Sequence, residues 1–343
     1  MINKITLVII FLLLIACQRQ DNDLVVVSLG GVHAKAQALA FYKPFEAISH
    51  VDVVGSTYNG EMGKIRSMIE THRVDWDVVQ VESANLIRGC SEGLFEPIDK
   101  AKLGNANLFI ADTFSECGVG FFTWSIIVAY DTNKLKEAPA SWQDFWDVKK
   151  FPGYRGLQRS PMIALEAALL ADGVKPADIY QQLTTAEGVD RAFHKLAELK
   201  PYIKWWDKGS QPLPMLLAGD VVMTSTFNGR AVIAKQEGKA VGLMWRDSFY
   251  DMDHFAIVKG SSHKELAEQF IAFSIAAEPQ EKFTEYSKYG FVNKATIAMI
   301  DPELLMNISN DPDTMQYAHR INANFWVEYG ESLVQRFNVW ASQ

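Results

Sequence analysis

The segment between residues 24 and 81 alternates strand-like and helix-like stretches, and this order limits the fold more than any other feature of the chain. Short Val-rich runs are typical of buried strands, and the stretches between them carry apolar residues at helical spacing. We expect strands at 24–28, 51–54 and 76–81, and helices at 34–48 and 60–70. The order β-α-β-α-β favours an α/β layer with a mostly parallel sheet.

The remainder of the chain continues the same mixture of elements. We expect further strands at 126–130, 221–226 and 254–258, and further helices at 141–147, 165–171, 188–199 and 263–277. The 343 residues are enough for two domains, yet the sequence contains no long linker, internal repeat or low-complexity tract. This organisation fits two lobes joined by strands that cross from one to the other and return.

The N-terminus carries an almost unbroken apolar run at residues 5–15. A bilayer span needs about 18 or more such residues, so this run has the length of a signal-peptide core instead. It ends in Leu-Ile-Ala-Cys at residues 14–17, which resembles a bacterial lipobox, where a lipid is attached to the cysteine and the chain is cut before it. We expect residues 1–17 to be a lipoprotein signal peptide ending at Cys17 and residues 18–23 to be a membrane tether. The alternative is an ordinary signal peptide with an incidental cysteine.

The net charge, the cysteines and the missing motifs bear on whether the chain binds nucleic acid, forms a disulfide, or holds a metal or cofactor. The net charge of −8 argues against a nucleic-acid partner, which would need basic patches. Cys90 and Cys117 remain beyond Cys17, and two cysteines in an exported chain suggest a disulfide, with two buried thiols as the alternative. Neither has a His or Cys at metal-ligand spacing, and phosphate-binding and dinucleotide-binding motifs are missing, so we predict neither a metal site nor a cofactor.

Residues 89–93, Gly-Cys-Ser-Glu-Gly, match the G-x-S-x-G pattern of hydrolases. That motif requires a strand before it and a helix after it. Here a helix-like stretch precedes the motif, and Pro97 limits any helix that follows. We therefore predict a glycine-bracketed loop without a nucleophile, and no enzymatic activity. A lipid-anchored esterase is the remote alternative.

Candidate binding residues follow the expected strands. In α/β sheets ligands sit beyond the carboxyl ends of the strands, which directs attention to residues 28–31, 56–60 and 82–85. Arg230 comes soon after a strand, and its planar guanidinium suits bidentate capture of a carboxylate. Asp253 could pair with an ammonium group. Trp206 precedes a polar loop, so we expect an aromatic ring at a cleft there.

Several segments resemble the spermidine/putrescine-binding family of extracellular solute-binding proteins. The most specific are residues 77–82, 93–98, 151–155, 168–173, 223–229 and 289–293. The resemblance covers nearly all of the mature chain and implies a two-lobed α/β periplasmic-binding-protein fold of type II with crossing hinge strands. We expect one lobe from residues 24–129 plus 258–305 and the other from 130–257 plus 306–343. The resemblance also implies a monomer that delivers a small molecule to the permease of an ABC importer, on the periplasmic or outer face of the cytoplasmic membrane.

The resemblance assigns roles to particular residues. In the polyamine binders an aromatic residue at the position of Phe227 stacks on the ligand, an Asp at the position of Asp253 pairs with an amine, and a Tyr at the position of Tyr289 closes the pocket. This chain departs from them at Arg230, where a small residue is usual, and at 160–165, where two acidic residues are missing. A buried arginine facing a polyamine would be repulsive. A branch that resembles γ-aminobutyrate-binding proteins carries this Arg and Asp pair.

Our hypothesis is therefore a zwitterion-binding site. Arg230 would hold a carboxylate, Asp253 would hold an ammonium, and Phe227 and Tyr289 would form apolar walls. The predicted site is completed by Trp206, Ser28, Glu82 and Asn228. Two alternatives stay open, namely a polyamine carrier with a rearranged pocket and a sensor protein that feeds a receptor.

Overall fold

The computed structural model describes residues 23–343, so the predicted signal peptide, Cys17 and all but the last residue of the predicted tether lie outside the described residues. Nine strands form one mixed sheet in the order β2-β1-β3-β8-β4-β7-β5-β6, and β9 also pairs with β8. The strands are β1 (Leu24–Ser28), β2 (Val53–Thr57), β3 (Val78–Glu82), β4 (Val119–Asp131), β5 (Arg155–Gln158), β6 (Ile203–Trp206), β7 (Met223–Phe227), β8 (Val241–Ile257) and β9 (His319–Arg320).

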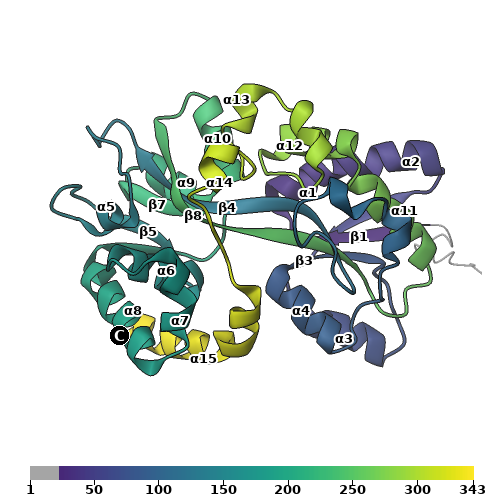
Figure 1. Cartoon of the computed structure of the whole chain (residues 1–343), viewed down its shortest axis with the longest axis horizontal. Coiled ribbons are helices and arrows are strands. Elements are labelled where there is room, and N and C mark those ends of the chain that lie inside the picture. Colours follow the sequence, from purple (N-terminus) through teal and green to yellow (C-terminus); the bar gives the residue numbers. More distant parts are fainter. Residues whose placement is uncertain (1–22) are drawn as a thin grey trace, which may run out of the picture.

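Helices cover the sheet on both sides, in two groups joined by the long strands (Figure 1). They are α1 (Gly31–Gln37), α2 (Lys43–Ser49), α3 (Met62–Glu70), α4 (Ser83–Ser91), α5 (Trp142–Trp146), α6 (Pro161–Ala171), α7 (Ile179–Leu183), α8 (Ala186–Leu199), α9 (Pro212–Leu217), α10 (Asn228–Gln236), α11 (Lys264–Ser274), α12 (Ala277–Ser287), α13 (Pro302–Leu305), α14 (Pro312–Met315) and α15 (Ala323–Ser342). Among residues 23–343, no helix combines the length and apolarity needed to cross a bilayer.

The N-terminal half has the predicted β-α-β-α-β order. β1 pairs in parallel with β2 and with β3, so the carboxyl ends of all three strands meet at one edge. The β1 strand has the predicted bounds, and its Val26 and Val27 side chains are fully buried. A second parallel group, β7-β5-β6, forms the other half. The chain thus builds two α/β halves, each with its own helices.

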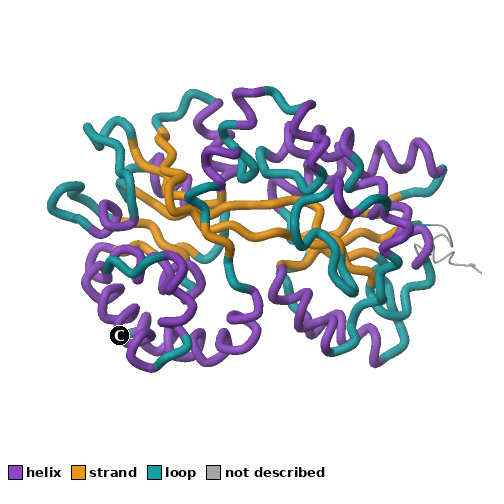
Figure 2. Tube along the Cα trace, viewed as in Figure 1, coloured by secondary structure: helices purple, strands orange, loops and turns teal. Residues whose placement is uncertain are grey.

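The two halves share β4 and β8, which run through the middle of the molecule (Figure 2). They pair antiparallel with each other, while β8 also pairs with β3 and β4 also pairs with β7. Both strands are longer than the sequence pattern predicted, with 13 and 17 residues. Residues 253–257 pair with β3. These residues thus pair with a strand of the N-terminal half, and the lobe boundary at 257 stays a prediction.

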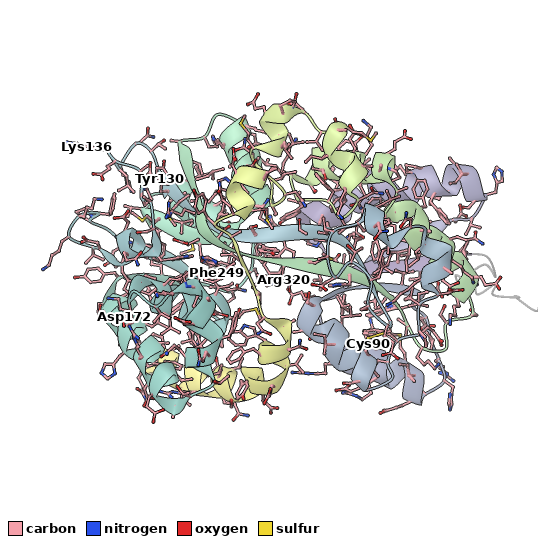
Figure 3. All side chains as sticks on the ribbon, in the orientation of Figure 1. Cys90, Tyr130, Lys136, Asp172, Phe249 and Arg320 are labelled. Carbon is pink, nitrogen blue, oxygen red and sulfur yellow. A yellow bond between two sulfur atoms is a disulfide. The ribbon has the colours of Figure 1, made fainter. Side chains whose placement is uncertain are left out.

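The C-terminal segment returns to these crossing strands. β9 pairs with β8 opposite Phe249 and Tyr250, and Arg320 forms an ion pair with Asp112 of the N-terminal half. Figure 3 shows Phe249 and Arg320 close together near the middle of the molecule. The helix that follows, α15, contacts both α4 and α6. The C-terminal segment thus touches both halves on its way to the end of the chain.

Aromatic rings form much of the core of the first half. The ring of Phe121 on β4 stacks on that of Phe255 on β8, with centroids 3.7 Å apart, and Phe41 stacks on Phe283 at 5.0 Å. All four side chains are fully buried. These rings connect β4 and β8 to the helical segments that carry Phe41 and Phe283. Their packing therefore fixes the two strands against the helices of the first half.

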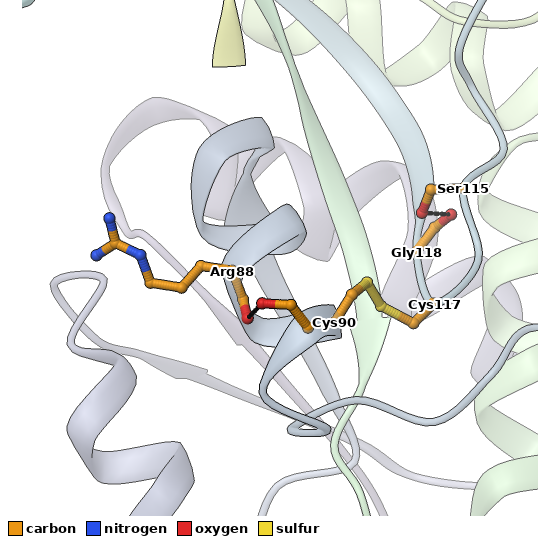
Figure 4. Close-up of a disulfide and its surroundings, with 6 residues drawn as sticks. Arg88, Cys90, Ser115, Cys117 and Gly118 are labelled. Atoms are coloured by element: carbon orange, nitrogen blue, oxygen red, sulfur yellow. Dashed lines mark hydrogen bonds between the residues drawn. A yellow bond between two sulfur atoms is a disulfide. The ribbon is translucent and has the colours of Figure 1, made fainter. Parts of the chain in front are cut away.

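Cys90 and Cys117 are joined by a disulfide, the pairing predicted from the sequence (Figure 4). Their Cα atoms lie 6.0 Å apart, within the range that disulfides require. The bond connects the last turn of α4 to the segment that enters β4. Gly93 ends α4 with a positive φ of 69°, while Leu94 N–H donates to the carbonyl of Gly89. Glycine is favoured at such a helix end because it has no Cβ to clash.

Removal of this disulfide should destabilise the folded protein by about 3 kcal/mol, because the open chain gains conformational freedom over the loop of 27 residues. Urea unfolding of the Cys90→Ser/Cys117→Ser double variant measures this loss of unfolding free energy. Ligand affinity should stay unchanged, since neither cysteine lines the binding cavity described below. An unfolding free energy equal to that of the wild type would contradict the prediction.

The G-x-S-x-G segment does not form the predicted loop throughout. Residues 89–91 are the last turn of α4, and the Ser91 hydroxyl donates to the carbonyl of Arg88 at 2.8 Å. Gly89 is required by packing, because a Cβ at that position would lie 2.2 Å from the ring of Phe95. Gly89 therefore allows α4 to pack against Phe95, and Ser91 belongs to the end of that helix.

Candidate ligand-binding site

A cavity of about 700 Å³ lies between the two halves. Its walls come from the carboxyl ends of β1, β2 and β3, from β4 and β8, and from the segments that follow β6 and β7. The lining residues are Leu29, Gly30, Gly31, His33, Asn59, Glu82, Phe122, Trp124, Asp207, Lys208, Gly209, Ser210, Phe227, Arg230, Asp253 and Tyr289. Five predicted site residues, Arg230, Asp253, Phe227, Tyr289 and Glu82, are therefore brought together in one cavity.

Asp253 on β8 supplies a carboxyl group at one end of this cavity. It is only 3% exposed, and its carboxylate accepts a hydrogen bond from Nε1 of Trp124 at 2.8 Å and another from the side-chain amide of Gln80. Glu82 is its direct partner across the antiparallel β3–β8 pair. Side chains in such a pair lie about 5 Å apart at Cβ, so two carboxyl groups face the same space.

A chain of side-chain hydrogen bonds fixes the orientation of Asp253. The hydroxyl of Tyr42 donates to Oε1 of Gln37, and Nε2 of Gln37 donates to Oε1 of Gln80 at 2.9 Å. Since the side-chain oxygen of Gln80 accepts this hydrogen bond from Gln37, the amide nitrogen of Gln80 must face Asp253. The segment at 77–82 thus positions the site, and only its last residue lines the cavity.

The acidic groups are held without a cation. Among residues 23–343, no Lys, Arg or His forms an ion pair with Glu82 or Asp253. Burial and the neighbouring Glu82 raise the pKa of Asp253 well above its usual range. Burial, followed by the charge of Asp251, raises the pKa of Glu82 to about 7. A cation bound at the Glu82–Asp253 end of the cavity would relieve the repulsion between the two carboxyl groups and favour their ionised forms.

Arg230, on the first turn of α10, supplies the opposite charge. Its guanidinium lies against the start of α1, because a Cβ on Gly31 would be 2.8 Å from Nη2 of Arg230. Gly31 has a positive φ of 77°, so glycine is favoured there on both backbone and steric grounds. Within residues 23–343, no acidic side chain forms an ion pair with Arg230. The guanidinium therefore lines the cavity as an uncompensated positive charge.

Aromatic rings lie between the two charged poles. Tyr289 packs on Phe122 with ring centroids 5.2 Å apart, and Phe227 packs edge-on against Trp124 at 5.4 Å. Burial raises the pKa of the Tyr289 hydroxyl, Arg230 lowers it and Asp253 raises it. Because both charges act on this one hydroxyl, Tyr289 lies within reach of both poles.

Comparisons with known proteins agree with this geometry. The family model described as bacterial extracellular solute-binding protein matches residues 40–313. The chain belongs to this family. It is 48% identical over 328 residues to the gamma-aminobutyric acid-binding protein of Pseudomonas aeruginosa, covering 96% of this chain and 93% of that protein. The spermidine/putrescine-binding periplasmic protein of Escherichia coli is 21% identical over 80% of this chain and 79% of its own length.

A solved structure of a GABA receptor superposes on this solute-binding protein with a TM-score of 0.85 and 28% identity, covering 93% of this chain and 98% of that one. The predicted two-lobed α/β fold and the predicted resemblance are thereby confirmed. The family and these relatives are binding proteins, so the chain is a solute-binding protein.

Three predicted site residues do not line the cavity of this solute-binding protein. Trp206 is fully buried behind Phe227, with ring centroids 6.3 Å apart. Ser28 accepts a hydrogen bond from Gly30 N–H in the loop after β1. Asn228 accepts from Ser125 N–H and donates to the carbonyl of Lys288, both at 2.9 Å. These residues support the walls of the cavity instead of forming them, because their side chains point into the surrounding structure.

Several lining residues were missed by the sequence prediction. Asn59 and His33 lie in or next to the expected strand-end segments, but nothing in the sequence singled them out. Phe122 and Trp124 belong to the part of β4 that the pattern did not predict. Their alternation, with one residue between them, is the signal that could have indicated a strand with one aromatic face.

Proposed function

We propose that this solute-binding protein captures a small zwitterion with an ammonium group at one end and a carboxylate at the other, and that γ-aminobutyrate is such a ligand. One observation carries the proposal, namely that an uncompensated Arg230 and an uncompensated Glu82–Asp253 pair line a single cavity. Buried charges without partners are costly. A ligand that brings both opposite charges satisfies both poles at once.

The relatives support the same ligand class. The Pseudomonas aeruginosa relative is named as a γ-aminobutyrate binder, and its similarity extends over nearly the whole chain. The polyamine binders are much more distant in sequence. A polyamine could use Glu82 and Asp253 at one end, but its other ammonium would approach Arg230, and juxtaposed like charges cost several kcal/mol.

The position of the charges suggests how capture proceeds. Arg230 lies in the first turn of α10 in the second half, whereas Glu82 ends β3 in the first half. A ligand bound to both would favour the conformation in which the halves are closest, by a shift of population toward the closed form. The closed, monomeric form would then deliver the ligand to the permease of an ABC importer. A lipid on Cys17 would hold the protein at the periplasmic or outer face of the membrane.

Isothermal calorimetry with γ-aminobutyrate and putrescine tests the ligand class. We expect γ-aminobutyrate to bind about 100-fold more tightly than putrescine, because only the zwitterion avoids repulsion by Arg230. Butyrate and 1-aminobutane, which each carry one charge, serve as controls and should both bind weakly. Tight binding of putrescine with no response to γ-aminobutyrate would reject the zwitterion and favour the polyamine alternative.

A further inference from the structure

His33, on α1, lines the cavity but has no role in the site described so far. Its ring packs against those of Phe122 and Tyr289, with centroids 5.8 and 6.2 Å apart. Nε2 is buried and makes no hydrogen bond within residues 23–343. The other nitrogen, Nδ1, is accessible and is also without a partner in that part of the chain. Nδ1 is therefore the polar atom that the ring offers to the cavity.

The imidazole of His33 is neutral at physiological pH. Burial, followed by the charge of Arg230, lowers its pKa to about 4. A neutral imidazole carries a single N–H, on one nitrogen or the other. A proton on the buried Nε2 would have no acceptor, whereas a proton on Nδ1 can reach a ligand or water in the cavity. The favoured tautomer thus directs an uncharged N–H donor into the cavity.

Arg230 lies close to this donor. Its Nη2 would be 2.8 Å from a Cβ on Gly31, which is two residues before His33 on the same helix. The influence of Arg230 on the pKa of His33 agrees with this proximity. No acidic side chain within residues 23–343 forms an ion pair with Arg230, and His33 has no hydrogen-bond acceptor there either. Two kinds of N–H donor therefore face the positive end of the cavity without an acceptor.

We propose that His33 and Arg230 together hold the carboxylate of the ligand, with Nδ1–H of His33 donating to one carboxylate oxygen. This inference rests on the proposed zwitterion ligand and names a second residue that recognises its anionic end. A carboxylate offers about four acceptor positions and can accept from both side chains. The corresponding carboxamide presents an NH₂ group to donors, so this subsite selects ω-amino carboxylates over ω-amino amides.

Two substitutions separate the hydrogen bond from the packing of the ring. His33→Phe keeps an aromatic ring against Phe122 and Tyr289 but removes the N–H. His33→Asn loses the ring but places an amide N–H near the position of Nδ1. We expect the affinity for γ-aminobutyrate to fall about tenfold or more in His33→Phe. His33→Asn should bind γ-aminobutyrate more tightly than His33→Phe, because its amide restores an N–H donor.

The control ligand is 1-aminobutane, which lacks the carboxylate. Calorimetry of both ligands against both proteins forms a cycle that isolates the contact between residue 33 and the carboxylate. The preference for γ-aminobutyrate over 1-aminobutane should fall about tenfold in His33→Phe. In the wild type, the ¹⁵N resonance of Nδ1 should shift when γ-aminobutyrate is added. Thermal unfolding confirms that the variants are folded.

The outcomes distinguish this inference from the proposed function. If the wild type binds γ-aminobutyrate and His33→Phe keeps the same preference over 1-aminobutane, the role of His33 is rejected and the zwitterion ligand stands. An Nδ1 resonance that does not respond to the ligand has the same meaning. If the wild type does not bind γ-aminobutyrate, the proposed function and this inference are both rejected.

Discussion

Replacement of Arg230 by glutamine should weaken the binding of γ-aminobutyrate by about 100-fold or more. Truncating one partner of a buried, hydrogen-bonded charge pair costs roughly 2–5 kcal/mol, since the other charge is left without compensation. Here the ligand carboxylate would lose the planar guanidinium, because Arg230 is the only arginine among residues 23–343 that lines the cavity, and the amine of Lys208 there cannot provide the same bidentate contact. Calorimetric titration of the variant with γ-aminobutyrate measures the loss.

Two further variants show whether the effect comes from the guanidinium itself. Arg230→Lys keeps the charge but loses the planar fork, so its affinity should lie between those of the wild type and Arg230→Gln. Lys235→Gln removes the same charge from the exposed last turn of the same helix and should leave affinity within about threefold of the wild type. If Arg230→Gln and Lys235→Gln have equal effects, the carboxylate does not bind at Arg230.

The β-α-β-α-β half of the fold could be predicted because its signals are local. The Val residues of β1 and β3 form short runs, and the helices between the strands carry apolar residues at helical spacing. The rule that ligands bind beyond the carboxyl ends of strands then led to Glu82 at the end of β3 and to Arg230 just after β7. Local pattern and topology indicated where these residues lie, and the family resemblance suggested the role of Arg230.

The crossing strand β8 could be predicted only in part. Its first portion contains Arg246, Asp247 and Ser248, which interrupt any apolar alternation. The strand continues through this portion because residues 241–244 and 249–255 pair with β4 on either side of a register shift, while β3 and β9 pair with residues 249–257 along the other edge. These pairings join residues far apart in the sequence, and no local pattern contains them.

Side-chain direction explains the errors at the site. Position near a strand end does not determine whether a side chain faces the cavity, and Trp206 and Asn228 turn away from it although Phe227 does not. His33 was missed for a related reason. Its environment is formed by Phe122, Tyr289 and Arg230, which come from three distant segments. The sequence around His33 therefore gives no indication that these three residues surround it.

The opposite pole provides the other large effect, because Asp253→Asn should lower the affinity for γ-aminobutyrate by about 100-fold or more. The substitution keeps the size of the side chain but removes the charge that would pair with the ligand ammonium. It also places an amide opposite the donors of Gln80 and Trp124, so part of the acceptor capacity is lost. Calorimetric titration of both proteins with γ-aminobutyrate at the same pH measures this loss.

Asp251→Asn is the matched control for Asp253→Asn. Asp251 lies two residues earlier on the same strand, is equally buried, and accepts a hydrogen bond from the hydroxyl of Ser83 at 2.6 Å. It does not line the ligand cavity. Its loss should therefore change the affinity for γ-aminobutyrate by less than about threefold, even if stability falls. If both variants lost the same affinity for γ-aminobutyrate, the ligand ammonium would respond to the total charge of the strand. A direct ion pair with Asp253 would then be excluded.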